Sequence, residues 1–107
     1  MTSDARPAIR DNVAAHRFEM VVDGHVAVAT YSIEGDTITF IHTVVPEALR
    51  GRGIARELVE FALAAARERG LKVVPQCEVF LAYMRKHAQT HDLLADKALF
   101  DSPGAPD

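Results

Sequence analysis

The sequence predicts an α/β fold: an antiparallel β-meander, then a strand–loop–helix–strand crossover, then a C-terminal helix. Three observations predict it. The first half of the chain holds runs of alternating apolar residues that are separated by short turn sequences. The second half contains an alanine-rich run with helical periodicity. A short apolar run follows that helix, and this order of strand, helix and strand implies a right-handed crossover with a parallel strand pair.

The meander consists of three predicted strands, over residues 17–22, 25–33 and 37–45. Asp23-Gly24 lies between the first two strands and is typical of a tight hairpin turn. Glu34-Gly35-Asp36 provides the second turn. Pro46 ends the third strand because proline has no N–H to donate to a neighbouring strand.

The second half predicts a helix over 54–69, a strand over 71–75, a helix over 78–87 and a short helix over 93–100. Gly70 is the expected end of the first helix, because glycine readily adopts the left-handed conformation that closes a helix. Arg67 and Arg69 in its last turn suit the negative end of the helix dipole.

Length and composition predict one compact domain. The chain has 107 residues, and 49% of them are hydrophobic, which is enough for one core and too much for a disordered chain. We expect a flexible leader over 1–12, a single domain over 13–100 and a frayed tail over 101–107.

Charge and cysteine content exclude several classes of protein. The net charge of −3 does not favour non-specific binding to nucleic acid. No apolar run approaches the roughly 18 residues of a membrane helix, and the polar N-terminus lacks the apolar stretch of a secretory signal. The single cysteine, Cys77, excludes an internal disulfide. We therefore expect a cytoplasmic protein with no nucleic-acid or membrane partner.

The most informative segment is Arg50-Gly51-Arg52-Gly53-Ile54-Ala55, between the third strand and the first helix. Its glycines let the backbone approach a ligand closely, and the N–H groups at a helix N-terminus bind anions. The segment therefore predicts a phosphate cradle. It lacks the Lys and hydroxyl of a nucleoside-triphosphate loop, and Arg56 stands where a dinucleotide fingerprint needs its third glycine.

Arg50–Ala55 fits the acyl-coenzyme A loop of the GCN5-related N-acetyltransferases (GNAT), which reads Gln or Arg, two residues, Gly, one residue, then Gly or Ala. The flanking segments His42–Pro46, Gly70–Cys77 and Tyr83–His87 follow in order. From about residue 14 to about residue 94, the chain resembles the minimal GNAT-like domains, which contain little beyond the coenzyme-binding core. One position departs, because Val44 stands where that family usually carries glutamate.

The resemblance implies that acetyl-coenzyme A is the acyl donor. Its pyrophosphate would bind the backbone amides of residues 52–55, and arginine side chains would add charge-assisted bonds. Its pantetheine arm would lie in a gap where the two strands around the helix part. The expected cofactor-binding residues are Val44, Val45, Arg50, Gly51, Arg52, Gly53, Ile54, Ala55, Pro75 and Cys77.

Three residues are candidates for catalysis. His42 is the expected general base for an amine, or else a strand histidine satisfied by nearby backbone. Tyr83 is either the acid that protonates the leaving thiolate, as the resemblance implies, or a core tyrosine with its hydroxyl at the edge. Cys77 either accepts the acyl group or lines the pocket, and we expect it to line the pocket. His87 and His91 have no convincing third ligand, so no metal site is expected.

These features predict an N-acetyltransferase that moves an acetyl group from coenzyme A to an amine. The alternative is a coenzyme A-binding or acyl-sensing module with little turnover, which Val44 favours. A structural partner protein that uses exposed sheet edges is a third hypothesis. The sequence leaves open whether the acceptor is a small amine, a peptide N-terminus or a lysine, and it leaves the oligomeric state open.

Overall fold

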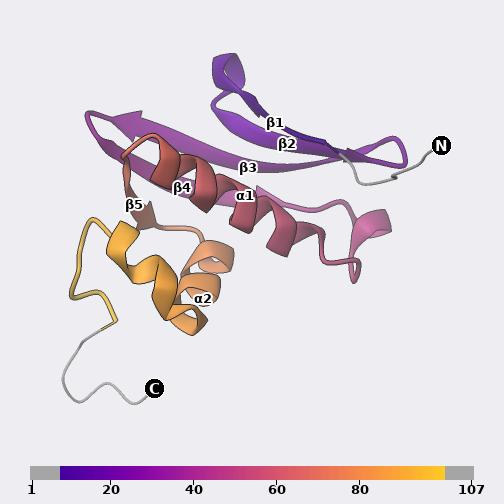
Figure 1. Cartoon of the computed structure of the whole chain (residues 1–107). Coiled ribbons are helices and arrows are strands. Elements are labelled where there is room, and N and C mark those ends of the chain that lie inside the picture. The colour runs from indigo at the N-terminus through magenta and orange to yellow at the C-terminus, as the bar shows by residue number, and fades with distance from the viewer. Residues whose placement is uncertain (1–7, 101–107) are drawn as a thin grey trace.

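A five-stranded sheet forms the framework of the protein in the computed structural model, which describes residues 8–100 (Figure 1). The strands are β1 (Ile9–Asn12), β2 (Arg17–Val22), β3 (His25–Glu34), β4 (Thr37–Val44) and β5 (Lys72–Pro75), and they neighbour one another in chain order. The first four strands pair antiparallel, whereas β4 and β5 are parallel. The predicted meander and crossover are therefore confirmed.

Two α-helices pack on one face of this sheet (Figure 1). They are α1 (Ile54–Glu68), which connects β4 to β5, and α2 (Glu78–Lys86), which follows β5. Short 3-10 helices lie at Val13–Ala15 (η1), Glu47–Leu49 (η2) and Ala88–Leu93 (η3). The mixed α/β architecture with a C-terminal helix confirms the predicted fold class, a small GNAT-like fold.

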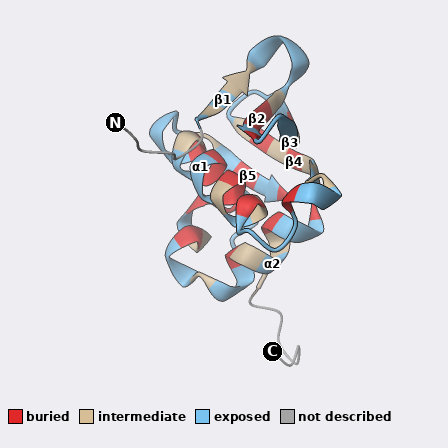
Figure 2. Cartoon of the chain, turned by 90° about the vertical axis from the view of Figure 1, so that its right-hand side faces the viewer, coloured by how far each residue is buried: buried red, intermediate tan, exposed pale blue. Residues whose placement is uncertain are grey.

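The core lies between the sheet and the two helices, as the buried segments in Figure 2 show. Because side chains alternate along a strand, Phe18, Met20 and Val22 of β2 all face the helices and are buried. Phe40 of β4 stacks on Phe80 of α2 with ring centroids 4.1 Å apart. This stack fixes α2 against the strand that carries the candidate site.

The opposite face of the sheet, here called the uncovered face, carries no α-helix among the residues that the structure describes (Figure 1). Val21 of β2 and Val26 of β3 form a cross-strand pair on it, and both are exposed. Glu19 also lies on this face, where it accepts hydrogen bonds from Arg17 at 2.7 Å and Asn12 at 2.9 Å.

Residues 9–12 correct the predicted boundary between leader and domain. We expected a flexible leader over 1–12, but Ile9–Asn12 form the edge strand β1 and pair with β2. The Tyr31 hydroxyl of β3 also donates to the Asp11 carboxylate at 2.5 Å. The polar composition hid this strand, because an edge strand often carries charged and polar side chains. Residues 1–7 and the predicted tail over 101–107 lie outside the described residues.

The predicted final helix over 93–100 is wrong. The helical turn lies earlier, in η3, and Leu94 forms a bridge with Val73 of β5. The Ala95 N–H donates to the Val73 carbonyl at 2.9 Å. Leu93 and Leu94 are both buried, so this apolar pair is held against the core and the edge of β5 in place of continuing a helix.

Candidate functional site

The strands β4 and β5 separate at one end of their parallel pair. The last paired residues are Phe40 and Pro75, whereas β4 continues to Val44. Pro75 has no N–H with which to extend the ladder. The edge of β4 over 41–44 that faces away from β3 therefore has no strand partner within residues 8–100. This opening matches the gap that the family resemblance implies.

Cys77 lies at the closed end of this opening. Its N–H donates to the Phe40 carbonyl oxygen at 2.8 Å, and it is the N-cap residue of α2. Its side chain forms no capping hydrogen bond with the helix. Instead, the Cys77 Sγ atom lies 3.3 Å from the Thr43 Oγ1 atom of β4. The thiol is thus buried at the positive end of a helix dipole, beside a hydroxyl group.

A β-bulge at Ile41 determines which way His42 points. Thr30 pairs with His42 and Tyr31 pairs with Phe40, so Ile41 is an additional residue on β4. Tyr31 and Phe40 are buried on the face that the helices cover. Past the bulge the alternation is shifted by one residue, and the exposed side chain of His42 lies on the uncovered face.

The same shift sends Thr43 to the helix-covered face. Thr43 pairs with Ala29, which is fully buried beneath the helices, and cross-strand partners share a face. The sheet therefore separates His42 from Cys77. Val44 lies on the uncovered face with His42 and is 56% exposed.

The glycine-rich loop leads to the N-terminus of α1 beside a cleft of 170 Å³. Gly51 and Gly53 have φ angles of 81° and 76°, a region that side-chain-bearing residues rarely adopt. The Glu57 N–H makes the first intrahelical bond, to the Gly53 carbonyl, at 3.1 Å. No side chain caps this end, so the N–H groups of residues 54–56 have no intrahelical partner. Val45, Arg50, Ile54 and Ala55 line the same cleft.

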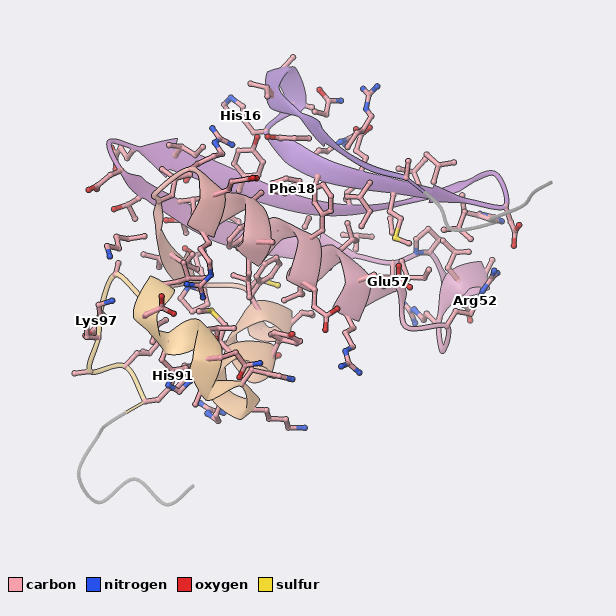
Figure 3. The ribbon with its side chains drawn as sticks, in the orientation of Figure 1. His16, Phe18, Arg52, Glu57, His91 and Lys97 are labelled. Carbon is pink, nitrogen blue, oxygen red and sulfur yellow. The ribbon has the colours of Figure 1, made fainter. Side chains whose placement is uncertain are left out.

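Each of the two loop arginines already has a partner. The Arg50 Nε–H donates to the Val45 carbonyl at 3.4 Å. The Arg52 Nη1 atom lies 2.9 Å from the Asp23 Oδ2 atom, in the β2–β3 hairpin. Figure 3 shows Arg52 at the end of the molecule where the loop enters α1, with Glu57 nearby. An exposed ion pair such as Arg52–Asp23 contributes about 0–1 kcal/mol, so a phosphate can replace the Asp23 carboxylate.

Tyr83 belongs to a hydrogen-bonded group between the two helices. Its hydroxyl donates to the Glu60 carboxylate of α1 at 3.0 Å, and the Arg56 Nε–H donates to the same oxygen at 2.9 Å. Burial and then the bond to Glu60 raise the pKa of Tyr83. The Arg56 guanidinium and then the Tyr83 hydroxyl lower the pKa of Glu60.

A family model described as GCN5-related N-acetyl-transferase matches residues 17–93, from the start of β2 to the end of η3. The chain belongs to this family. Membership indicates an acetyltransferase-type function and confirms the resemblance that the loop and its flanking segments carry. A search of the curated proteins found no match.

This GCN5-related domain brings some of the predicted site residues together and keeps others apart. The cleft at α1 gathers Val45 and the loop residues except Arg52, which pairs with Asp23 of the β2–β3 hairpin. The opening between β4 and β5 adjoins Cys77. His42 lies across the sheet, and the Tyr83 hydroxyl turns toward α1.

Two residues of the site were missed in the sequence. The sequence did not indicate Thr43, because strict alternation of side chains from Phe40 onward would place it on the uncovered face. Glu60 lies four residues after Arg56 on a predicted helix, and that spacing is a usable signal for an ion pair.

Two further findings concern metals and membranes. No group of three or more potential metal ligands occurs within residues 8–100, and His87 and His91 each hydrogen-bond a backbone carbonyl of α2 at 2.7 Å. None of the described helices has the length and apolar character to cross a membrane.

Proposed function

We propose that this protein binds acetyl-coenzyme A and transfers the acetyl group to an amine. One observation carries the proposal: an uncapped helix N-terminus follows two positive-φ glycines, after a strand whose outer edge is unpaired over residues 41–44. The cradle offers N–H groups to the pyrophosphate, and Arg50 lines the same cleft. Arg52 would turn from Asp23 to add a second charge-assisted bond. The family membership supports the same coenzyme.

The unpaired edge of β4 fits the pantetheine arm. That arm contains amide groups, which can bond those N–H and C=O groups of residues 41–44 that point away from β3, as a neighbouring strand would. It would run from the cradle toward Cys77 and Thr43, where the thioester would lie. Pro75 keeps this edge open because it ends the β5 ladder. The coenzyme supplies an activated acyl group, and the chain supplies its position.

His42 is the general base in this proposal. A backbone N–H near Val44 or Val45 would polarise the acyl carbonyl, and His42 would take the proton that the attacking amine loses. The side chain of His42 lies on the uncovered face, so the amine would approach from that face. The C–N bond would form as the C–S bond breaks, and the thiolate would leave toward the helix-covered side.

Cys77 lines the pocket in this proposal, and Tyr83 forms part of the wall between the helices. A raised pKa makes the Tyr83 phenol a weaker acid, and its proton is directed to Glu60. These two facts favour a binding role for Tyr83 over protonation of the thiolate.

Calorimetric titration of the full chain with coenzyme A and acetyl-coenzyme A tests the binding step. Saturable binding of both is expected, and the absence of binding to either would refute the proposal. Thiol release in the presence of small amines, peptides with a free N-terminus and lysine peptides then tests turnover.

A second function is a coenzyme A-binding module with little turnover. The exposed Val44 favours it, because a valine there cannot serve as the base that the family usually carries at this position. Binding of coenzyme A without amine-dependent thiol release would support the module.

A further inference from the structure

A cleft of 440 Å³ lies at the outer edge of β5 and shares no lining residue with the cleft at α1. β5 contributes residues 73–75 to its lining, and α2 contributes Leu81. The segment that follows η3 runs along the same edge of β5 (Figure 1) and contributes residues 94–96 and Leu99. The volume falls in the range of about 300–1,000 Å³ that is usual for small-molecule sites.

The lining of this cleft is apolar except for one carboxylate. Val73 and Leu94 are almost fully buried behind it. Val74 and Leu99 are instead 37% and 38% exposed, so apolar surface within the cleft remains in contact with water. Because removing such surface from water is favourable, the cleft favours a ligand with an apolar body.

Asp96 is the charged residue among those that line the cleft. Its Oδ1 atom accepts the Ala98 N–H at 3.0 Å, and its Oδ2 atom has no hydrogen-bond partner within residues 8–100. The neighbouring Lys97 donates to the Asp92 carbonyl and does not line the cleft. A negative charge beside an apolar lining favours an organic cation over an organic anion.

The cleft extends to the opening between β4 and β5. Pro75 lines the cleft and is also the last residue of β5, where the two strands separate. The exposed Val74 lies between two buried residues of β5, so it points to the uncovered face. It pairs with Thr39, and His42 lies on the same face three residues further along β4, a separation of roughly 10 Å. An amine on a chain of several carbons can therefore occupy the cleft and reach His42.

We propose that this cleft binds the apolar body of the acetyl acceptor, so that the acceptor is a hydrophobic amine. This inference rests on the proposed function and names its substrate class. The carbon chain lies against Val74 and Leu99, and Asp96 attracts the cationic amine to the cleft. The amine then passes the end of β5 at Pro75 and meets His42, the proposed base, on the uncovered face.

Titration of the full chain with butylamine, hexylamine and octylamine tests the cleft. These amines have nearly the same basicity, so the series varies apolar length alone. We expect affinity to rise about threefold to fourfold per added methylene, because burying each one contributes about this factor. Octanoate should bind about tenfold more weakly than octylamine, because Asp96 repels it. Equal affinity across the amines, or octanoate binding as tight as that of octylamine, would overturn the proposal.

Two variants separate the apolar contact from the charge. Val74→Thr should weaken octylamine binding about threefold, whereas Val21→Thr, at an exposed valine of β2, is the matched control and should not. Asp96→Asn keeps an acceptor for the Ala98 N–H and should remove most of the preference for octylamine over octanoate. Asp36→Asn makes the same charge change elsewhere and should retain the preference. Equal effects of either variant and its control would overturn the proposal.

Thiol release from acetyl-coenzyme A distinguishes this proposal from the one it rests on. Octylamine should have a KM at least about tenfold below that of ethylamine. Equal KM values, or a lower KM for a peptide with a free N-terminus, would overturn the hydrophobic acceptor and leave the transfer intact. Binding of octylamine without thiol release from any amine would overturn the transfer and leave the binding site. A dimer that Val74→Thr dissociates would assign the cleft to a second copy of the chain and overturn the proposal.

Discussion

The sulfur atom of Cys77 lies 3.3 Å from the hydroxyl oxygen of Thr43, at the point where β4 and β5 separate. The two residues are 34 positions apart in the chain, and the contact joins the N-terminus of α2 to the end of β4. In the proposed complex the thioester lies beside this pair. The contact therefore marks the position at which the proposed acyl transfer would take place.

Cys77→Ala tests whether the thiol takes the acyl group. We expect coenzyme affinity to persist and amine-dependent thiol release to fall by less than about tenfold, because in the proposed reaction transfer is direct and the thiol only lines the pocket. The free energy of unfolding should fall by about 1 kcal/mol, because a small buried group is removed. Intact mass measurement of the wild type with acetyl-coenzyme A should reveal no acetyl adduct. An adduct that Cys77→Ser lacks would establish a covalent role and contradict this prediction.

His42→Ala tests the proposed base. Loss of a general base typically lowers a rate by about 10²- to 10⁴-fold, and we expect a decrease in that range for amine-dependent thiol release. Coenzyme affinity should hardly change, because the side chain lies on the uncovered face, away from the cradle. His25→Ala, at an exposed position of β3, is the control and should retain full activity. If His42→Ala turned over at the wild-type rate, water would accept the proton of the amine in place of His42.

Most of the fold could be predicted from local patterns, since the turns, the helix stop at Gly70 and the crossover each have a short sequence signal. The bulge at Ile41 has no such signal. It depends on how β3 and β4 pair over their whole length, and it decides that His42 and Cys77 occupy opposite faces. The residue types of the site could thus be predicted, whereas their relative orientation could not.

β1, near the N-terminus, shows the same limit of prediction from local sequence patterns. Its residues look like a polar leader, and only the pairing with β2 and the Tyr31–Asp11 bond identify them as a strand. Contacts of this kind, with residues distant in the chain, cannot be predicted from a short stretch of sequence.

Gly53→Ala tests the cradle, with Gly70→Ala as a matched control. Both glycines have positive φ, and an added Cβ meets no protein atom within 4 Å at either position. Each substitution should therefore lower the free energy of unfolding by a similar amount, about 1 kcal/mol, through backbone strain alone. Only Gly53→Ala should weaken coenzyme binding, because Gly53 lines the cleft. Titration of both variants measures the difference, and equal affinities would place the pyrophosphate elsewhere.

Asp23→Asn tests whether the ion pair with the β2–β3 hairpin restrains Arg52. Removing this carboxylate frees the guanidinium and removes a negative charge near the cradle, so coenzyme affinity should rise about twofold to threefold at low salt. Asp36→Asn makes the same charge change in the other hairpin turn and should have no such effect. The gain should vanish in high salt. A weaker affinity in Asp23→Asn would mean that the pair orients Arg52 for the ligand.

We expect the free energy of unfolding to fall at alkaline pH because of Tyr31. Burial and then the hydrogen bond to Asp11 raise the pKa of Tyr31 to about 12, from its ordinary value of 10.0. Between these two values the unfolded chain releases the phenol proton while the native chain keeps it, so stability is complete below about pH 10 and falls as pH rises toward 12. The loss is on the order of 2 kcal/mol. Urea denaturation across this range should show the fall in the wild type and in Tyr83→Phe. Tyr31→Phe should be less stable at neutral pH, by about 1 kcal/mol for the lost hydrogen bond, yet nearly free of the alkaline step. If the loss of stability between pH 10 and 12 persisted in Tyr31→Phe, the titration would belong to another group. That result would also argue against the Tyr31–Asp11 bond as an attachment of β1.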